Sequence, residues 1–339
     1  MKKVLLHTLS HGNGVCFDSS VRDACNEPYI RLREAYGKKG VLFDTADKNS
    51  LSDCKRIIFS EIPSTYLGIK GKARQIKRMV TRKPTRNIFK ECIDLGMHNK
   101  MALILTEPPS VFPENWDIRL HSHFPVIFTW NDRLIDGKKY IKLPAVPQPE
   151  NYPKLPIIPF SKKKLLVNIS MNKLSSHPKE LYSERVRSIK YFEMYHPKNF
   201  DLFGIGWNKR GVFQRNHYSS YHGSIANKWD VLPYYRFSIC YENVHGELGY
   251  ITEKIIDCLR CNCVPIYWGA ENITDYVDKN AFIDRRNFKT NADLGKYLSS
   301  ITEDRYMEYI EAIESFLNSK KFLFFLSSNW IDTIMENLN

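Results

Sequence analysis

Short apolar runs alternate with helix-like segments along the first half of the chain. The apolar runs are rich in β-branched and aromatic residues, as buried strands are, and lie at 3–10, 41–46, 56–62, 100–107 and 123–132. Segments with a helical period fall between them, in the second half of 18–40, ending at Gly40, and at 82–96. Strands that alternate with helices predict a parallel sheet with crossover helices.

The second half of the chain repeats this alternation after a proline-rich stretch. Residues 144–159 contain six prolines, a composition typical of a stiff, extended linker. Beyond it, strand-like runs lie at 163–170, 200–207, 237–241 and 263–269, and helical patterns lie at 182–195 and 252–262. We predict domains at 1–150 and 160–305, followed by a helical segment at 306–339 that packs back on the first domain.

Composition and charge narrow the class of protein. Of 339 residues, 43% are hydrophobic and 26% are charged, which is ordinary for a globular protein. The formal net charge of +13 favours an anionic partner, such as a phosphorylated ligand, nucleic acid or a membrane surface.

The eight cysteines lie mostly in apolar or helical contexts, and we predict free thiols in a reducing compartment. Cys258 and Cys261 form a CxxC, but no second pair or histidine partner follows at zinc-site spacing, so we expect core packing. The first apolar run is shorter than the core of a secretory signal, and no window is apolar enough for a transmembrane helix. We expect a cytoplasmic protein, with peripheral membrane association left open.

The stretch "YENVHGELGYITEK" places polar side chains between two strand-like runs. Thr252 can cap a helix that begins at Glu253, and Gly246 and Gly249 allow a tight backbone path before it. A helix amino terminus attracts anions, whereas Lys254 in the first turn has the charge that the helix dipole disfavours. A bound diphosphate would explain that lysine, and Glu253 would suit a ribose diol. A solvated helix start with a capping threonine is the alternative.

The longer stretch "FSICYENVHGELGYITEKIIDCLRCNCVPIYWG" resembles the signature of the α-1,3/4-fucosyltransferases, glycosyltransferase family 10. That signature reads approximately F-x-x-x-[FY]-E-N, a variable loop, Y-[IVF]-T-E-K and, after a helix, V-P-[IV]-x-x-G. Its fixed positions are matched by Phe237, Glu242, Asn243, Tyr250, Thr252, Glu253, Lys254, Val264, Pro265 and Gly269. The resemblance extends from about 164 to 290. It implies an α/β fold of the GT-B type, in which two Rossmann-like domains face each other across a cleft.

The resemblance further implies that GDP-fucose is the donor and that the fucose carbon is inverted. It implies that Asn243 and Tyr250 contact the donor, Glu253 the ribose and Lys254 the phosphates, while Glu242 orients the loop or the sugar. Thr252 belongs to the same donor-binding set. The loop has one more residue between Asn243 and Tyr250 than bacterial members of the family, which leaves a different GDP-sugar open.

Further cations are expected to face the departing diphosphate. The family places an arginine after the strand that precedes the signature, and "FGIGWNKRGVFQR" offers Lys209 and Arg210 there, with Arg215 as the spare. Lys228 matches a frequent family lysine and is a further candidate. The alternative for each of these four residues is that it is a solvated surface charge with no role in donor binding. The chain has no Asp-x-Asp motif, so we expect that no metal or other cofactor is required.

Inverting transfer needs a general base that takes the proton of the acceptor hydroxyl. In the family this is a carboxylate of the first domain at the end of a strand. "ALILTEPPSVFPENWD" has this layout, with Glu107 closing the run and two prolines holding the following backbone extended. Glu61, His7 and His11 lie near other strand ends and are the rival candidates.

The sequence thus predicts a fucosyltransferase that uses GDP-fucose and an oligosaccharide acceptor, in protein or lipopolysaccharide glycosylation, with a lipid-linked acceptor left open. The alternatives are a transferase of another GDP-sugar and a basic nucleotide- or nucleic-acid-binding protein without catalysis. The cations form no stripe with interleaved aromatic residues, so we expect no nucleic-acid partner. The oligomeric state is not predicted.

Overall fold

The computed structural model describes residues 2–8, 14–63, 76, 80, 86–208 and 218–338. The chain forms two compact units: unit 1 is Met1–Pro149 with Leu326–Asn339, and unit 2 is Glu150–Phe325. The division falls inside the proline-rich stretch, which runs without helix or strand from 150 to 159.

Unit 1 is built on a six-stranded parallel sheet with strand order β2-β1-β3-β4-β5-β6. Its strands are β1 (Lys3–Thr8), β2 (Leu42–Thr45), β3 (Cys54–Ser60), β4 (Met101–Leu105), β5 (Val126–Thr129) and β6 (Tyr140–Lys142). Its helices are α1 (Glu27–Lys38), α3 (Ile88–Asp94) and α10 (Ser327–Leu338). The short, polar strand β6 was not predicted.

Successive side chains of the central strands pack into two different hydrophobic cores, one on each face of the sheet. Val4 and Leu6 of β1 face the cluster that includes α10, whereas Leu5 faces the cluster that includes α3. This alternation is the two-residue period of a strand buried on both faces. It explains why the sequence shows continuous apolar runs at these strands.

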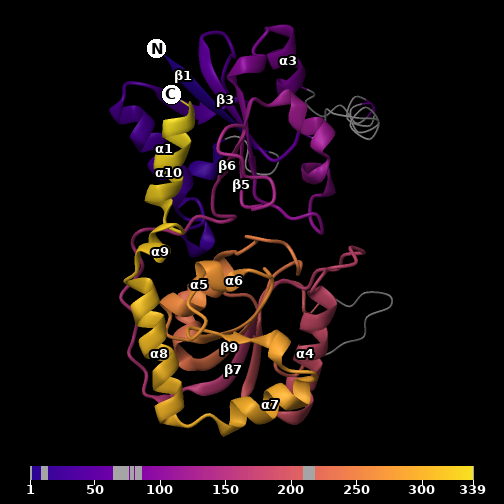
Figure 1. The fold of residues 1–339 in the computed structure, drawn as a ribbon, viewed down its shortest axis with the longest axis vertical. Coiled ribbons are helices and arrows are strands. Elements are labelled where there is room, and N and C mark those ends of the chain that lie inside the picture. The colour runs from indigo at the N-terminus through magenta and orange to yellow at the C-terminus, as the bar shows by residue number, and fades with distance from the viewer. Residues whose placement is uncertain are drawn as a thin grey trace. The chain divides into compact units, whose positions relative to one another are not determined.

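Helix α10 returns the end of the chain to unit 1 and lies beside α1 (Figure 1). Trp330 and Ile334 of α10 are buried in the sheet core, and the Ser327 N–H donates to the carbonyl of Gln148 at 2.8 Å. Helices α8 (Glu303–Leu317) and α9 (Lys320–Leu323) belong to unit 2. The tail that we expected as one segment is therefore divided between the units.

Unit 2 has a five-stranded parallel sheet with strand order β11-β10-β9-β7-β8. The strands are β7 (Lys164–Ile169), β8 (Phe200–Phe203), β9 (Tyr235–Tyr241), β10 (Val264–Trp268) and β11 (Ile283–Asp284). The remaining helices are α4 (Tyr182–Tyr195), α5 (Glu253–Arg260), α6 (Ile273–Tyr276) and α7 (Asn291–Ser300). Because the strands are parallel, β7, β9 and β10 end at the same edge of the sheet, where the site lies.

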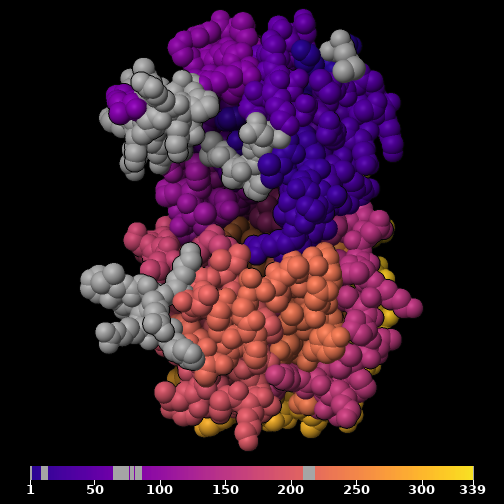
Figure 2. Space-filling view, turned by 180° about the vertical axis from the view of Figure 1, so that it is seen from behind, coloured from indigo at the N-terminus to yellow at the C-terminus, as the bar shows by residue number. Residues whose placement is uncertain are grey.

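Helix α8 runs along one side of unit 2 (Figure 1). Figure 2 shows unit 2 from behind. Residues from the middle of the chain form this face, and the yellow C-terminal residues are visible only at its edge. Over the part of the chain that is described, no helix has both the length and the apolar character needed to cross a membrane.

Candidate functional site

One buried carboxylate, that of Glu242, organises the start of helix α5. Glu242 directly follows β9, and its side chain is fully buried. Its Oε1 accepts the backbone N–H of Thr252 at 2.8 Å, and its Oε2 accepts the Thr252 hydroxyl at 2.7 Å and the Lys254 ammonium at 3.1 Å. Three donors satisfy a carboxylate that would otherwise be costly to bury. Glu242 therefore ties the end of β9 to the first turn of α5.

Helix α5 begins at Glu253 and is capped by Thr252, which confirms the predicted helix start. The Thr252 hydroxyl accepts the backbone N–H of Lys254 at 3.4 Å and lies 3.0 Å from the Lys254 ammonium. In the preceding loop, Gly246 and Gly249 have φ values of 75° and 79°. These left-handed angles favour glycine, so the loop path depends on both residues.

Gly269, the first residue after β10, leaves the space that Glu242 occupies. A Cβ at this position would lie 2.4 Å from Cγ of Glu242 and 2.5 Å from the hydroxyl oxygen of Tyr267. These distances are far below a van der Waals contact. The ends of β9 and β10 therefore require glycine at this point of the signature.

Lys228 is held by two carboxylates of helix α5. Its ammonium lies 2.6 Å from Oδ2 of Asp257 and 3.4 Å from Oε1 of Glu253. Burial by itself would raise the pKa of Glu253. The nearby ammonium groups of Lys254 and Lys228 have the larger combined effect and lower this pKa to about 2. Glu253 is therefore ionised at neutral pH, and about a third of its side chain, 32%, is exposed for a ligand.

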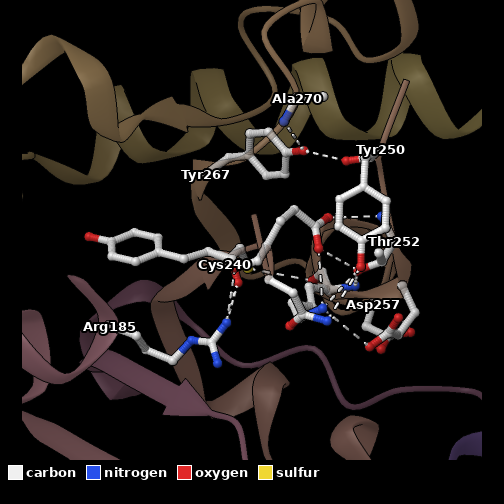
Figure 3. A network of polar contacts seen from close by, with 12 residues as sticks. Arg185, Cys240, Tyr250, Thr252, Asp257, Tyr267 and Ala270 are labelled. Atoms are coloured by element: carbon white, nitrogen blue, oxygen red, sulfur yellow. Dashed lines mark hydrogen bonds and ion pairs between the residues drawn. The ribbon is translucent and has the colours of Figure 1, made fainter. Parts of the chain in front are cut away.

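Asn243 and Tyr250 come together across the loop. The Asn243 side-chain amide lies 3.4 Å from the Tyr250 hydroxyl, and Tyr250 is buried. The Tyr267 hydroxyl donates to the Tyr250 carbonyl at 3.4 Å and accepts the Ala270 N–H at 3.0 Å. Figure 3 shows this chain from Tyr250 through Tyr267 to Ala270. The loop is thereby tied to the end of β10.

Arg185 of helix α4 belongs to this site, although the sequence analysis missed it. Its buried guanidinium points toward the end of β9 (Figure 3) and donates to the carbonyls of Tyr241 at 2.6 Å and Glu242 at 3.3 Å. Burial lowers its pKa. A signal was present, because Arg185 falls in the same helical stripe as the buried residues Ile189 and Phe192.

A cavity in unit 2 lies among the charged groups at the start of α5. Three cationic side chains line it, those of Arg185, Lys228 and Lys254, together with polar and apolar residues at the ends of β7 and β9. Its empty space is about 310 Å³, counting the part that opens to solvent. Each lysine reaches a carboxylate, so the cations are fixed in position.

Several other predicted residues lie outside the described residues. They are Lys209, Arg210 and Arg215, the proposed partners of a diphosphate, and His11, one of the rival bases.

The remaining base candidates lie in unit 1. Glu107 follows β4 and is half-buried. Glu61 is buried at the end of β3, with its carboxylate oxygens hydrogen-bonded to the segment after β4. Burial lowers the pKa of His7 to about 4, so this imidazole is neutral at pH 7. Of the two carboxylates, Glu107 is the less buried.

The cysteines are free thiols, as predicted, and seven of the eight are buried. The sulfur atoms of Cys240 and Cys258 lie 3.2 Å apart beneath the start of α5. Within the described ranges, no three His, Cys, Asp or Glu side chains are grouped to hold a metal ion.

Comparison with known proteins identifies the second unit. The family described as Glycosyltransferase family 10 (fucosyltransferase) C-term matches residues 161–327. This region is similar to the C-terminal domain of the family 10 glycosyltransferases. The match contains the cavity and the helix start described above, and it confirms the resemblance found in the sequence.

Individual relatives are matched over short segments. The α-(1,3)-fucosyltransferase FucT of Helicobacter pylori is 38% identical over 78 residues, 22% of this chain and 16% of that protein. GDP-fucose protein O-fucosyltransferase 3 of Xenopus laevis is 34% identical over 96 residues, 27% of this chain and 20% of that protein. The matched segments therefore span a fifth or less of these relatives' own lengths.

The fold agrees with a solved glycosyltransferase over the whole chain. A crystal structure of α1,3-fucosyltransferase with GDP-fucose has a TM-score of 0.56 at 13% identity, covering 100% of this chain and 91% of that one. With its two parallel-sheet α/β domains, the chain has the GT-B fold, as predicted.

Proposed function

We propose that this protein transfers L-fucose from GDP-fucose to a hydroxyl group of an acceptor glycan, with inversion at the sugar carbon. The observation that carries the proposal is the cavity lined by Arg185, Lys228 and Lys254 beside the start of α5, within the region that matches family 10. Fixed cations next to a helix amino terminus suit a diphosphate. The names of the fucosyltransferase relatives support GDP-fucose as the donor.

Within this proposal, Lys254 and Arg185 bind the diphosphate, and Glu253 accepts hydrogen bonds from the ribose hydroxyls. Asn243 and Tyr250 contact the sugar half of the donor. Glu242 and Thr252 support these donor contacts indirectly, because they hold the start of helix α5 in place. Lys209 and Arg210 remain candidates for a further phosphate contact, and Lys228 sets the charge and position of Glu253 through their 3.4 Å ion pair.

The transfer itself is a single displacement. The acceptor oxygen forms a bond to C1 of fucose while the bond from C1 to the phosphate oxygen breaks, and its electron pair leaves with GDP. Glu107 takes the proton of the acceptor hydroxyl as general base. The cations stabilise the charge that develops on the departing GDP, so we propose that no metal ion is needed.

The acceptor and the donor sugar each have a second candidate. A protein hydroxyl is favoured as the alternative acceptor by the relative named GDP-fucose protein O-fucosyltransferase 3. Another GDP-sugar is the alternative donor, because the longer loop between Asn243 and Tyr250 lies where the sugar is expected. A lipid-linked oligosaccharide is a further form of the glycan acceptor.

A transfer assay in EDTA tests this function. The protein is incubated with GDP-fucose and Lewis-type precursor glycans or folded protein acceptors, and the anomeric configuration of the product is read by NMR. We expect the product to be an inverted fucoside. For Glu107→Gln we expect a rate at least about 100-fold lower, the usual contribution of a general base. Glu114→Gln, in the same segment, is the matched control and keeps the rate. Full activity of Glu107→Gln would contradict the role of Glu107.

A further inference from the structure

Glu61 is a buried acidic residue at the point where β3 ends in unit 1. It is 8% exposed, and its backbone has a φ of 71°, a left-handed angle that is uncommon for a residue with a side chain. Uncommon backbone angles persist where the surroundings impose them, often at functional sites. The proposed transfer leaves Glu61 without a role.

The partners of Glu61 lie in the segment that carries Glu107. Oε1 of Glu61 accepts the backbone N–H of Thr106 at 3.1 Å and that of Glu107 at 3.0 Å, and it also accepts the Thr106 hydroxyl. Oε2 accepts from the side-chain amide of Asn115, whose Oδ1 accepts the N–H of Ile62 at 3.0 Å. Glu61 thereby ties the end of β3 to the turn after β4.

The backbone of Glu107 is held from its other side as well. Its carbonyl accepts the Asn115 amide at 3.3 Å and the Trp116 indole N–H at 3.2 Å, and the preceding Thr106 carbonyl accepts the Trp130 indole N–H at 3.0 Å. Both peptide groups around Glu107 are therefore fixed, while its side chain stays half-exposed. A rigid second layer of this kind is what keeps a reactive group in its working geometry.

We propose that Glu61 is a positioning residue that holds Glu107 at the end of β4 in the orientation needed to take the acceptor proton. The inference rests on the proposed function, in which Glu107 is the base. Glu61 does not act as the base itself, because its side chain is buried and both of its oxygens are taken up by internal donors. This proposal gives different roles to the two carboxylates that the sequence left as rivals.

The hydrogen bonds suit the ionised form of Glu61. The two backbone amides and the Asn115 amide can only donate, which a carboxylate accepts on both oxygens. Burial raises the Glu61 pKa to about 7, hydrogen bonds from Thr106 and Glu107 oppose the rise, and the Glu107 charge adds to it. A glutamine would keep an acceptor for Thr106 and Glu107 but turn an NH₂ group toward Asn115. Glu61→Gln therefore loosens this network without removing the side chain.

A double-mutant cycle tests the inference on the full chain. GDP-fucose alone is the probe, with water as acceptor, and GDP release gives kcat and KM for wild type, Glu61→Gln, Glu107→Gln and the double variant. We expect Glu61→Gln to lower kcat about 10-fold with KM changed less than about twofold, since misplacing a base slows the proton transfer but leaves donor binding intact. The double variant is expected to be no slower than Glu107→Gln alone, because Glu61 acts through Glu107.

Two further variants keep the test decisive. Thr106→Val removes one donor to Glu61 and is expected to lower kcat about threefold, even where Glu61→Gln does not fold. Asp94→Asn, an exposed carboxylate of α3, is the control and keeps kcat. An unchanged kcat in Glu61→Gln and Thr106→Val, or losses that multiply with that of Glu107→Gln, overturns the inference. If Glu107→Gln itself keeps full kcat, the base assignment fails, and a loss in Glu61→Gln under that condition also overturns the positioning role.

Discussion

Lys254 and Glu242 form an ion pair whose Nζ and Oε2 atoms lie 3.1 Å apart, with the acid fully buried and the base 20% exposed. Lys254 stands in the first turn of α5, where the helix dipole disfavours a cation. Glu242 supplies the compensating charge, so the lysine that suggested a bound anion also has a partner within the chain. The pair holds Lys254 in one position and reduces the conformational freedom that a ligand would have to restrict.

Glu242→Gln tests this pairing through stability. The glutamine keeps the shape of the side chain but leaves Lys254 without its counter-charge. We expect the free energy of unfolding to fall by about 3 kcal/mol, the lower end for breaking one side of a buried pair, because Lys254 keeps some contact with water. Urea unfolding followed by tryptophan fluorescence measures the change. Glu247→Gln, which breaks the more exposed pair with Lys179, should cost less than about 1 kcal/mol; equal losses would contradict the account.

Arg185→Met tests whether the buried arginine of α4 binds the diphosphate. We expect GDP affinity to fall about 10-fold or more, because a charge-assisted contact in a partly desolvated cavity is lost. Calorimetric titration with GDP gives the affinity, and thermal unfolding without ligand reports whether the variant folds. Arg187→Met is the matched control, since Arg187 lies on the exposed side of the same helix. A folded Arg185→Met variant with unchanged affinity would exclude Arg185 from the site.

Gly269→Ala tests the close approach of β10 to Glu242. The added methyl group meets Glu242 Cγ at 2.4 Å, so either the side chain or the strand end must move. We expect a loss of about 1–3 kcal/mol in stability, as for other overpacked sites, together with weaker GDP binding. Urea unfolding and titration with GDP measure the two effects. Gly137→Ala, at a positive-φ glycine with open space around it, should weaken stability but leave GDP binding unchanged.

The raised pKa of Glu61 predicts a pH dependence of stability. The folded protein holds this proton up to about pH 7, whereas an ordinary glutamate releases it near 4.5. Burial outweighs the hydrogen bonds that favour the ionised form, so the protonated form of Glu61 adds to folding stability. This contribution is complete below about pH 4.5 and is lost as pH rises through 7, amounting to about 3 kcal/mol. Urea unfolding of wild type and Glu61→Gln between pH 5 and 8 should show this slope in the wild type and its absence in the variant. If the free energies of unfolding of wild type and Glu61→Gln changed in parallel with pH, this prediction would be wrong.

Local patterns were sufficient for the central strands of both sheets, the alternation of helices and the start of α5. Thr252 and Glu253 mark that helix start by residue type alone, and Gly246 and Gly249 indicate the turn before it. These features depend on backbone preferences of a few neighbouring residues, which the sequence displays directly.

The partners of the charged residues were not predictable in the same way. Glu242 meets Lys254 because the end of β9 and the first turn of α5 approach in space, and Arg185 reaches this point from a helix far earlier in the chain. The sequence predicts candidate cations in a loop after a strand, which lies outside the described residues, and it does not reveal that Arg185 on the inner face of α4 also lines the cavity. The division of the C-terminal helices between two units also depends on tertiary packing, which a helical period does not reveal.

Titration calorimetry with GDP, GDP-fucose, GDP-mannose and UDP in the presence of EDTA tests the central claim most directly. We predict binding of GDP without metal, tighter or equal binding of GDP-fucose relative to GDP-mannose, and no comparable binding of UDP. Preference for UDP, or no binding of GDP without metal, would contradict the proposed metal-independent GDP-fucose site.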